Sequence, residues 1–146
     1  MMRTISRRLF VIAGVFFAGA LLISAQAQPL AKNGQRPATL DGARDAIIRT
    51  IGAEKDTVAI VTTAKTATVE RINSNMNGSS HGARNNEAIV IGPIVSQAIA
   101  DKPEFKGVVV IRVQYLRRSS PGSKAEVVDT IEFRKDASGK FQFHET

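Results

Sequence analysis

Three segments near the C-terminal end alternate apolar and polar residues with a period of two, and this pattern constrains the fold more than any other feature of the chain. The apolar positions are Val109, Ile111, Val113 and Tyr115 in the first segment, Val127, Ile131 and Phe133 in the second, and Phe141 and Phe143 in the third. A period of two is typical of a strand with one buried face. Turn-forming sequences at 119–123 and 136–139 separate the segments. The pattern predicts a meander of three antiparallel strands with one buried face.

Two further strands are expected earlier in the chain. Residues 57–63 and 66–72 are rich in β-branched side chains, and only Ala64 and Lys65 separate them. The short separation favours a hairpin over a single long bent strand. The turn contains no glycine or asparagine, although a two-residue turn usually needs a residue that tolerates positive φ.

Apolar residues at helical spacing predict two helices. The first begins with Asp41 as its N-cap, runs to Ile51 and stops at Gly52. In the second, the apolar stripe is Ala88, Ile91, Val95, Ala98 and Ile99. Pro93 interrupts this stripe, which leaves two interpretations: one kinked helix over 82–101, or a strand at 88–91 followed by a helix from Pro93. The stripe keeps its phase across the proline, which favours one helix.

The resulting order of elements is α-β-β-α-β-β-β. It predicts a single α+β domain over residues 40–146, with two helices packed on one face of a mostly antiparallel sheet of about five strands. The helix-strand-strand-helix-strand part resembles the element order of BON domains, which are small envelope modules linked with phospholipid surfaces. The resemblance spans about half the chain without a shared motif, and it implies a membrane surface as a candidate partner.

The first 27 residues have the layout of a cleavable export signal. Arginines at positions 3, 7 and 8 precede an apolar run over 9–23, and Ala25 and Ala27 provide small residues for cleavage. The apolar run of 15 residues is shorter than the roughly 20 that a membrane-spanning helix needs. We therefore expect cleavage after Ala27 and a periplasmic or extracellular protein.

Two details concern the route of export and the segment after the signal. Residues 6–10, Ser-Arg-Arg-Leu-Phe, resemble a twin-arginine signal, although the general Sec route is the default expectation.

Residues 28–39 contain two prolines and few apolar side chains, which predicts a flexible lead-in to the domain.

Composition excludes several classes of function. The 146 residues include no cysteine, which excludes disulfides, thiolate metal sites and cysteine nucleophiles. The two histidines, His81 and His144, lack a second ligand at helical spacing, and neither GxxxxGK[ST] nor GxGxxG occurs, so we expect no metal and no cofactor. After signal cleavage 17 basic and 13 acidic residues remain, with no aromatic ladder beside the basic ones, which argues against a nucleic-acid partner.

Residues 73–87 are the most polar part of the expected mature chain, with five asparagines among fifteen residues. A connection between a strand and a helix usually takes about 2–6 residues, and this one is longer. Backbone amides at the start of a helix, with basic side chains beside them, form a small anion site. The candidate ligand-binding residues are Ser79, Ser80, His81, Gly82 and Arg84. The simpler interpretation is a serine cap on the second helix and a loop without a ligand.

These features favour an exported, non-catalytic binding domain of the bacterial envelope, whose partner is an unidentified envelope ligand or protein and for which an anion is one candidate ligand. One alternative is a small hydrolase centred on His81, with Ser79 or Ser80 as nucleophile and Glu87 as the carboxylate. Another is a structural or inhibitory module that pairs with a partner through the edge of its last strand.

Overall fold

The computed structural model describes residues 40–144 and has the predicted order of elements. The expected export signal and lead-in lie outside these residues. The elements are α1 (Leu40–Ile51), β1 (Val58–Thr62), β2 (Thr66–Ile72), α2 (His81–Ile99), β3 (Val110–Arg117), β4 (Glu126–Lys135) and β5 (Phe141–His144). Short 3₁₀ turns precede β1, α2 and β3. The α+β class is therefore confirmed.

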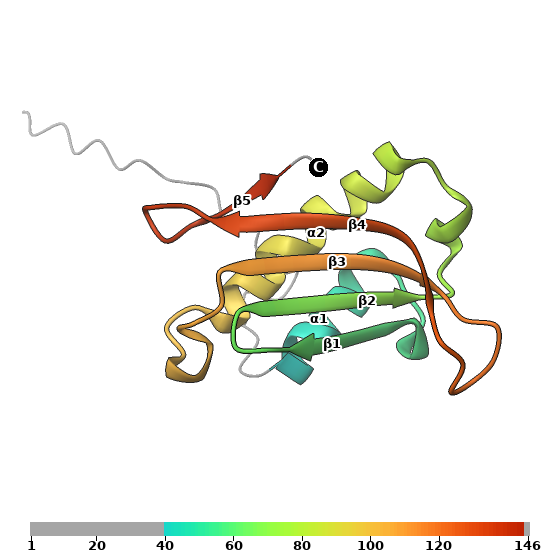
Figure 1. Ribbon diagram of the computed structural model, residues 1–146, viewed down its shortest axis with the longest axis horizontal. Helices are drawn as coiled ribbons and strands as arrows, with labels where there is room; N and C mark the ends of the chain where they lie inside the picture. The colour runs from blue at the N-terminus through green and yellow to red at the C-terminus, as the bar shows by residue number, and fades with distance from the viewer. Residues whose placement is uncertain (1–39, 145–146) are drawn as a thin grey trace, which may run out of the picture.

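The five strands form one sheet in the order β1-β2-β3-β4-β5. Strands β2 and β3 are parallel, because α2 carries the chain back between them, and all other neighbours are antiparallel. Figure 1 shows α1 and α2 behind the sheet, on the same face, with β1 at one edge and β5 at the other. The sheet thus has one face covered by helices and one open face. Within residues 40–144, no helix has the length and apolar character needed to cross a membrane.

The core lies between the helices and the covered face of the sheet. Its principal fully buried side chains are Ile47 from α1, Ile91 and Val95 from α2, Val69 from β2, and Ile111, Val113 and Tyr115 from β3. Helix α1 ends at Ile51, and the next residue, Gly52, has a φ of 66°, the left-handed conformation expected at a helix stop. The helix begins at Leu40, so Asp41 lies in its first turn and not at the predicted N-cap position.

A threonine side chain replaces the missing glycine in the β1–β2 hairpin. Thr63 Oγ1 accepts hydrogen bonds from the backbone amides of Lys65 and Thr66, and the Thr63 amide donates to the Thr66 carbonyl at 2.8 Å. The Lys65 carbonyl in turn accepts from Val109 and Val110, at 2.9 and 3.2 Å. These bonds stabilise the turn without a residue at positive φ.

Helix α2 is continuous through Pro93, so the alternative of a strand at 88–91 is wrong. A proline has no N–H to donate to the carbonyl one turn earlier, here that of Ile89, and an internal proline costs about 3 kcal/mol. The buried stripe outweighs this cost, because Ile91 and Val95 flank the proline and each buried aliphatic side chain contributes about 1.5–3 kcal/mol. The helix ends at Ile99, two residues before the predicted end.

The predicted buried face of the sheet is correct in its centre and wrong at its margins. Ile111, Val113, Ile131 and Phe133 are buried, as is Tyr115, and Phe141 is half-buried. Val109, Val127 and Phe143 were also expected in the core, but their exposed fractions are 42%, 54% and 39%.

Each of these three errors has its own cause. Val109 precedes β3, which begins one residue later, and Val108 is buried in its place. The pairing of β3 with β4 shifts at Tyr115/Leu116, so the alternation of β4 is interrupted before it reaches Val127. Phe143 lies on β5, the outermost strand, where the helices cover the sheet incompletely.

Candidate functional site

The polar loop between β2 and α2 is pinned to the end of β3 by asparagine side chains. Asn73 donates from Nδ2 to the Arg118 carbonyl at 2.9 Å, and its Oδ1 accepts from the Arg118 amide at 2.7 Å. Asn77 Nδ2 donates to the Leu116 carbonyl, also at 2.9 Å. Two of the asparagines that made this segment conspicuous in the sequence therefore hold the loop against the sheet.

The serines of the predicted anion site make local contacts. Ser80 is the N-cap of α2, and its Oγ accepts from the Ala83 amide at 3.2 Å. Ser79 Oγ lies 3.8 Å from Met76 Sδ. Gly82 lies in the first turn of α2, with open space on the side where a Cβ would be. The capping role is thus clear for Ser80.

Arg84 is directed into the protein. Its Nε donates to Asp129 Oδ2 at 2.6 Å, and its Nη1 donates to the carbonyls of Met76 and Ser79 at 3.2 and 2.5 Å. The guanidinium lies over the Tyr115 ring, 6.0 Å from its centroid, and the Tyr115 hydroxyl donates to the Arg84 carbonyl. Because Asp129 already neutralises the buried guanidinium, the contacts of Arg84 are those of a residue that stabilises the fold.

His81 shares the same carboxylate. Its Nδ1 lies 2.8 Å from Asp129 Oδ2, and its side chain is half exposed. Asp129 Oδ1 accepts from the amide of Thr130. Burial raises the pKa of Asp129, but hydrogen bonds from Arg84 and His81 outweigh burial, and the pKa lies below its ordinary value. Asp129 therefore joins the start of α2 to β4 as an ionised group.

The residues of the hydrolase alternative are not gathered in one place. Glu87 pairs with Arg71, with Oε1 2.8 Å from Nε and Oε2 3.4 Å from Nη2. The carboxylate at His81 is Asp129, and the Ser80 hydroxyl is engaged at the helix cap. A hydrolase would need one of the two serines at the imidazole.

Arg71 and Glu87 belong to a second buried polar group beside Tyr115. Arg71 Nη1 donates to Thr57 Oγ1 at 3.0 Å. Burial, and after it the charge of Glu87, raises the pKa of Tyr115 far above its ordinary value, so the phenol stays protonated. The two ion pairs, Arg71–Glu87 and Arg84–Asp129, thus attach α2 to the sheet.

His144, the other histidine, is exposed at the end of β5. Within the part of the chain that the structure describes, no three histidine, aspartate or glutamate side chains are grouped so that they could hold a metal ion.

A more open site lies on the helix side of the sheet, between α2 and the β4–β5 hairpin. Two adjoining hollows, of about 480 and 530 Å³, share Ser96, Gly139 and Phe141 in their linings. We call them together the β5 groove. The first is lined mainly by Ile89, Pro93, Phe133 and Phe143, and the second by Ile99, Phe105, Lys106 and Lys135. The first contains mostly apolar side chains, and the second combines apolar with charged side chains.

The aromatic residues of the β5 groove pack against each other and leave apolar surface exposed. The rings of Phe133 and Phe143 meet edge to face, with centroids 5.9 Å apart. Phe133 is buried, but Phe143 is 39% exposed and Ile89, across the groove on α2, is 49% exposed. The sequence indicated Phe141 and Phe143 only as core residues, because periodicity does not show where helix cover ends.

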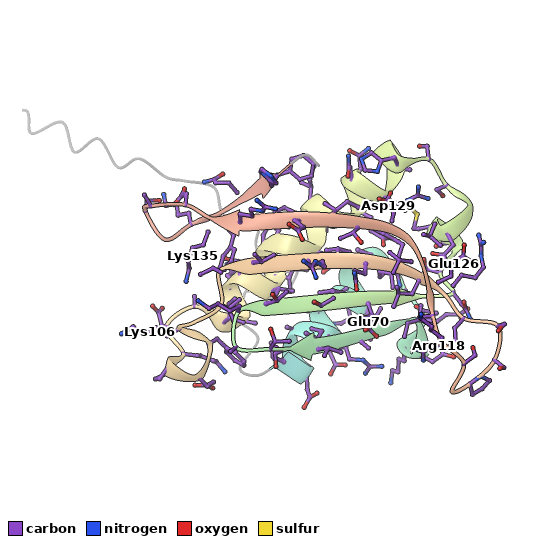
Figure 2. All side chains as sticks on the ribbon, in the orientation of Figure 1. Glu70, Lys106, Arg118, Glu126, Asp129 and Lys135 are labelled. Carbon is purple, nitrogen blue, oxygen red and sulfur yellow. The ribbon has the colours of Figure 1, made fainter. Side chains whose placement is uncertain are left out.

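One end of the β5 groove is basic. Lys102, Lys106 and Lys135 line the second hollow, Lys140 lines the first, and Asp101 is the acidic residue in the lining. The Lys135 ammonium lies 5.3 Å from the centroid of the Phe141 ring. Figure 2 shows Lys106 and Lys135 at the same end of the sheet, with Asp129 at the opposite end of β4. The groove therefore combines an apolar lining with positive charge at one end.

Comparison with known proteins adds no relative. No family model, curated protein or solved structure matches this chain. The resemblance to BON domains accordingly stays one of element order, and the site is interpreted from its own geometry.

Proposed function

We propose that this protein is an exported, non-catalytic binding domain of the bacterial envelope, and that its ligand site is the β5 groove. The ligand joins an apolar body to a negative charge. The observation that supports this proposal is the pairing of exposed Phe143 and Ile89 with four lysines along one groove, Lys102, Lys106, Lys135 and Lys140. This assignment keeps the anionic ligand expected from the sequence and moves its site away from Arg84.

The groove also contrasts with the open face of the sheet, where the central charges are already paired. Glu132 Oε1 lies 2.6 Å from Arg112 Nη2, and its Oε2 lies 3.0 Å from Arg134 Nη2. Hydrogen bonds from Arg112 lower the pKa of Glu132 despite its burial, with a smaller contribution from Arg134. A ligand at this face would have to compete with these bonds, whereas a ligand in the groove covers apolar surface that water now contacts.

The export part of the proposal rests on residues 1–27. The mature N-terminus is expected to be Gln28, because Ala25 and Ala27 are the small pair that follows the apolar run. The intact mass of the protein recovered from the periplasm or medium measures this directly. A protein that retains Met1, or that is cut beyond Thr39, would contradict the assignment.

The groove is tested with dodecanoate as the probe, below its micellar concentration, by isothermal titration calorimetry on the mature protein. Burying an aromatic side chain contributes about 1.5–3 kcal/mol, and each 1.4 kcal/mol is a factor of ten in affinity. Phe143→Ser is therefore expected to weaken binding at least tenfold.

The matched control is Val61→Ser, because Val61 is 49% exposed and lies on β1, at the opposite edge of the sheet. This variant should bind dodecanoate as the wild type does. Dodecyltrimethylammonium, with the same chain and the opposite charge, should bind more weakly because of the lysines. If Phe143→Ser and Val61→Ser bind dodecanoate equally, the groove is not the ligand site.

A further inference from the structure

The β5 groove lies beside a free strand edge. Strand β5 is outermost in the sheet, and no strand of the described chain lies beyond it. The residues that line the groove, Phe141 and Phe143, belong to this strand. A ligand in the groove is therefore next to unpaired backbone as well as to apolar side chains.

The hydrogen-bond pattern shows which backbone groups face outward. The Asp136 amide donates to the Lys140 carbonyl at 2.8 Å, which starts the β4–β5 ladder at the turn. Hydrogen-bonded and non-hydrogen-bonded pairs alternate in antiparallel strands. The pairs Arg134–Gln142 and Glu132–His144 are therefore bonded, while Lys135–Phe141 and Phe133–Phe143 are not. The N–H and C=O groups of Phe141 and Phe143 consequently point away from β4.

The same alternation determines where the side chains of an added strand would lie. Residues directly opposite each other in a sheet present their side chains on the same face. Phe143 is opposite buried Phe133, so its side chain is on the helix side of the sheet. A residue paired with Phe143 or Phe141 would form two backbone hydrogen bonds and place its own side chain in the groove.

Two outward-facing backbone groups elsewhere at the sheet edges already have side-chain partners. Where β4 extends beyond β5, the Thr130 amide donates to the side chain of Asp129. At β1, the Val58 carbonyl accepts from Arg44 Nε at 2.6 Å. Side chains thus block strand pairing at these two positions, which is a common protection of sheet edges.

We infer that the ligand of the β5 groove is an extended peptide segment of another protein, which pairs with β5 as a sixth strand. This inference rests on the proposed function and names its ligand class. Antiparallel pairing is the more stable arrangement, and it places the C-terminal part of the peptide beside Lys135 and Lys140. The segment has apolar side chains at alternate positions, followed by acidic residues. Backbone bonds supply affinity and the groove supplies sequence preference.

The probe is a set of peptides of the form acetyl-Thr-X-Thr-X-Thr-Asp-Asp-amide, in which each X is valine, isoleucine, leucine or phenylalanine. Binding to the mature protein is measured by fluorescence anisotropy. We expect at least one member to bind, and its counterpart with both aspartates moved to the N-terminal end to bind at least fivefold more weakly.

Backbone methylation tests strand pairing itself. N-methylation at the X positions removes the donors that face β5 and is expected to weaken binding at least tenfold. N-methylation at the central threonine changes an amide that faces solvent and should change the affinity less than threefold. Equal effects at both kinds of position would overturn the inference.

Two variants of β5 provide the matching test from the protein side. Phe143→Ala and Phe143→Pro both remove the ring, but only the proline variant also removes the outward N–H. An edge strand tolerates proline at such a position, because the missing N–H makes no bond within the sheet. The proline variant should bind the peptide at least threefold more weakly than the alanine variant, while the two bind dodecanoate equally. If dodecanoate binds and no peptide does, the inference fails and the proposed function stands. If neither binds, the proposed function fails as well.

Discussion

Replacing Arg71 with methionine is expected to lower the free energy of unfolding by about 3–5 kcal/mol, because breaking a buried ion pair leaves an uncompensated charge. The side chains of Arg71 and Glu87 are 3% and 12% exposed. Without the guanidinium, the Glu87 carboxylate would remain beside Tyr115 in a poorly hydrated place. Urea unfolding of the mature protein measures the change in free energy.

The double variant Arg71→Met, Glu87→Met is the control for this result. Replacing both members of a buried pair with apolar side chains of similar volume is often neutral. The double variant is therefore expected to recover most of the stability that Arg71→Met loses. If it is as unstable as the single variant, the role of Arg71 lies in its bond to Thr57 and not in its pairing with Glu87.

The helices and strands were predictable because burial in this small domain follows simple periods. Ile47 in α1, Val95 in α2 and Ile131 in β4 are buried as their spacing indicates. The continuity of α2 through Pro93 was also predictable, because the apolar stripe kept its phase across the proline. A local penalty at one residue did not outweigh packing along the whole helix.

The polar contacts were much less predictable, because they join residues far apart in the chain. Asp129 lies 48 residues from His81, and nothing near either residue in the sequence indicates the other. The available signal was that Asp129 has the same parity as Ile131 and Phe133 on β4, so it points toward the helices. A charged residue in that phase needs a buried partner, and the candidates were the basic side chains of α2.

The β5 groove was hidden for a different reason. Alternation shows that Phe143 lies on the same side of its strand as Phe141, but not how far the helices extend over that side. How much of β5 the helices cover depends on where α2 crosses the sheet, and packing along the whole helix sets that position. An apolar residue on an outermost strand is therefore ambiguous between core and binding surface until the topology is known.

Phe133→Ala is expected to lower the free energy of unfolding by about 3–5 kcal/mol, because it removes a buried ring from the core and leaves a cavity. Phe133 is 6% exposed, whereas the next residue, Arg134, has a 55% exposed side chain on the open face. Arg134→Ala should cost less than about 1 kcal/mol, since Arg134 is largely exposed and Glu132 keeps its ion pair with Arg112. Similar losses for the two variants would mean that the phase of β4 is wrong.

The contact of this ring with Gly92 gives a sharper test, because the effect of Gly92→Ala on the free energy of unfolding should change sign when the ring is removed. A Cβ added at Gly92 would lie 2.8 Å from Cζ of Phe133, so Gly92→Ala alone overpacks the interface and is expected to destabilise by about 1–3 kcal/mol. In the Phe133→Ala background the ring is absent and the new methyl group enters the vacated space. There Gly92→Ala should stabilise by about 1 kcal/mol, the ordinary helix preference for alanine over glycine. Urea unfolding of the four proteins in this cycle gives both values, and a destabilising effect of equal size in the two backgrounds would show that the Phe133 ring does not pack on α2 at Gly92.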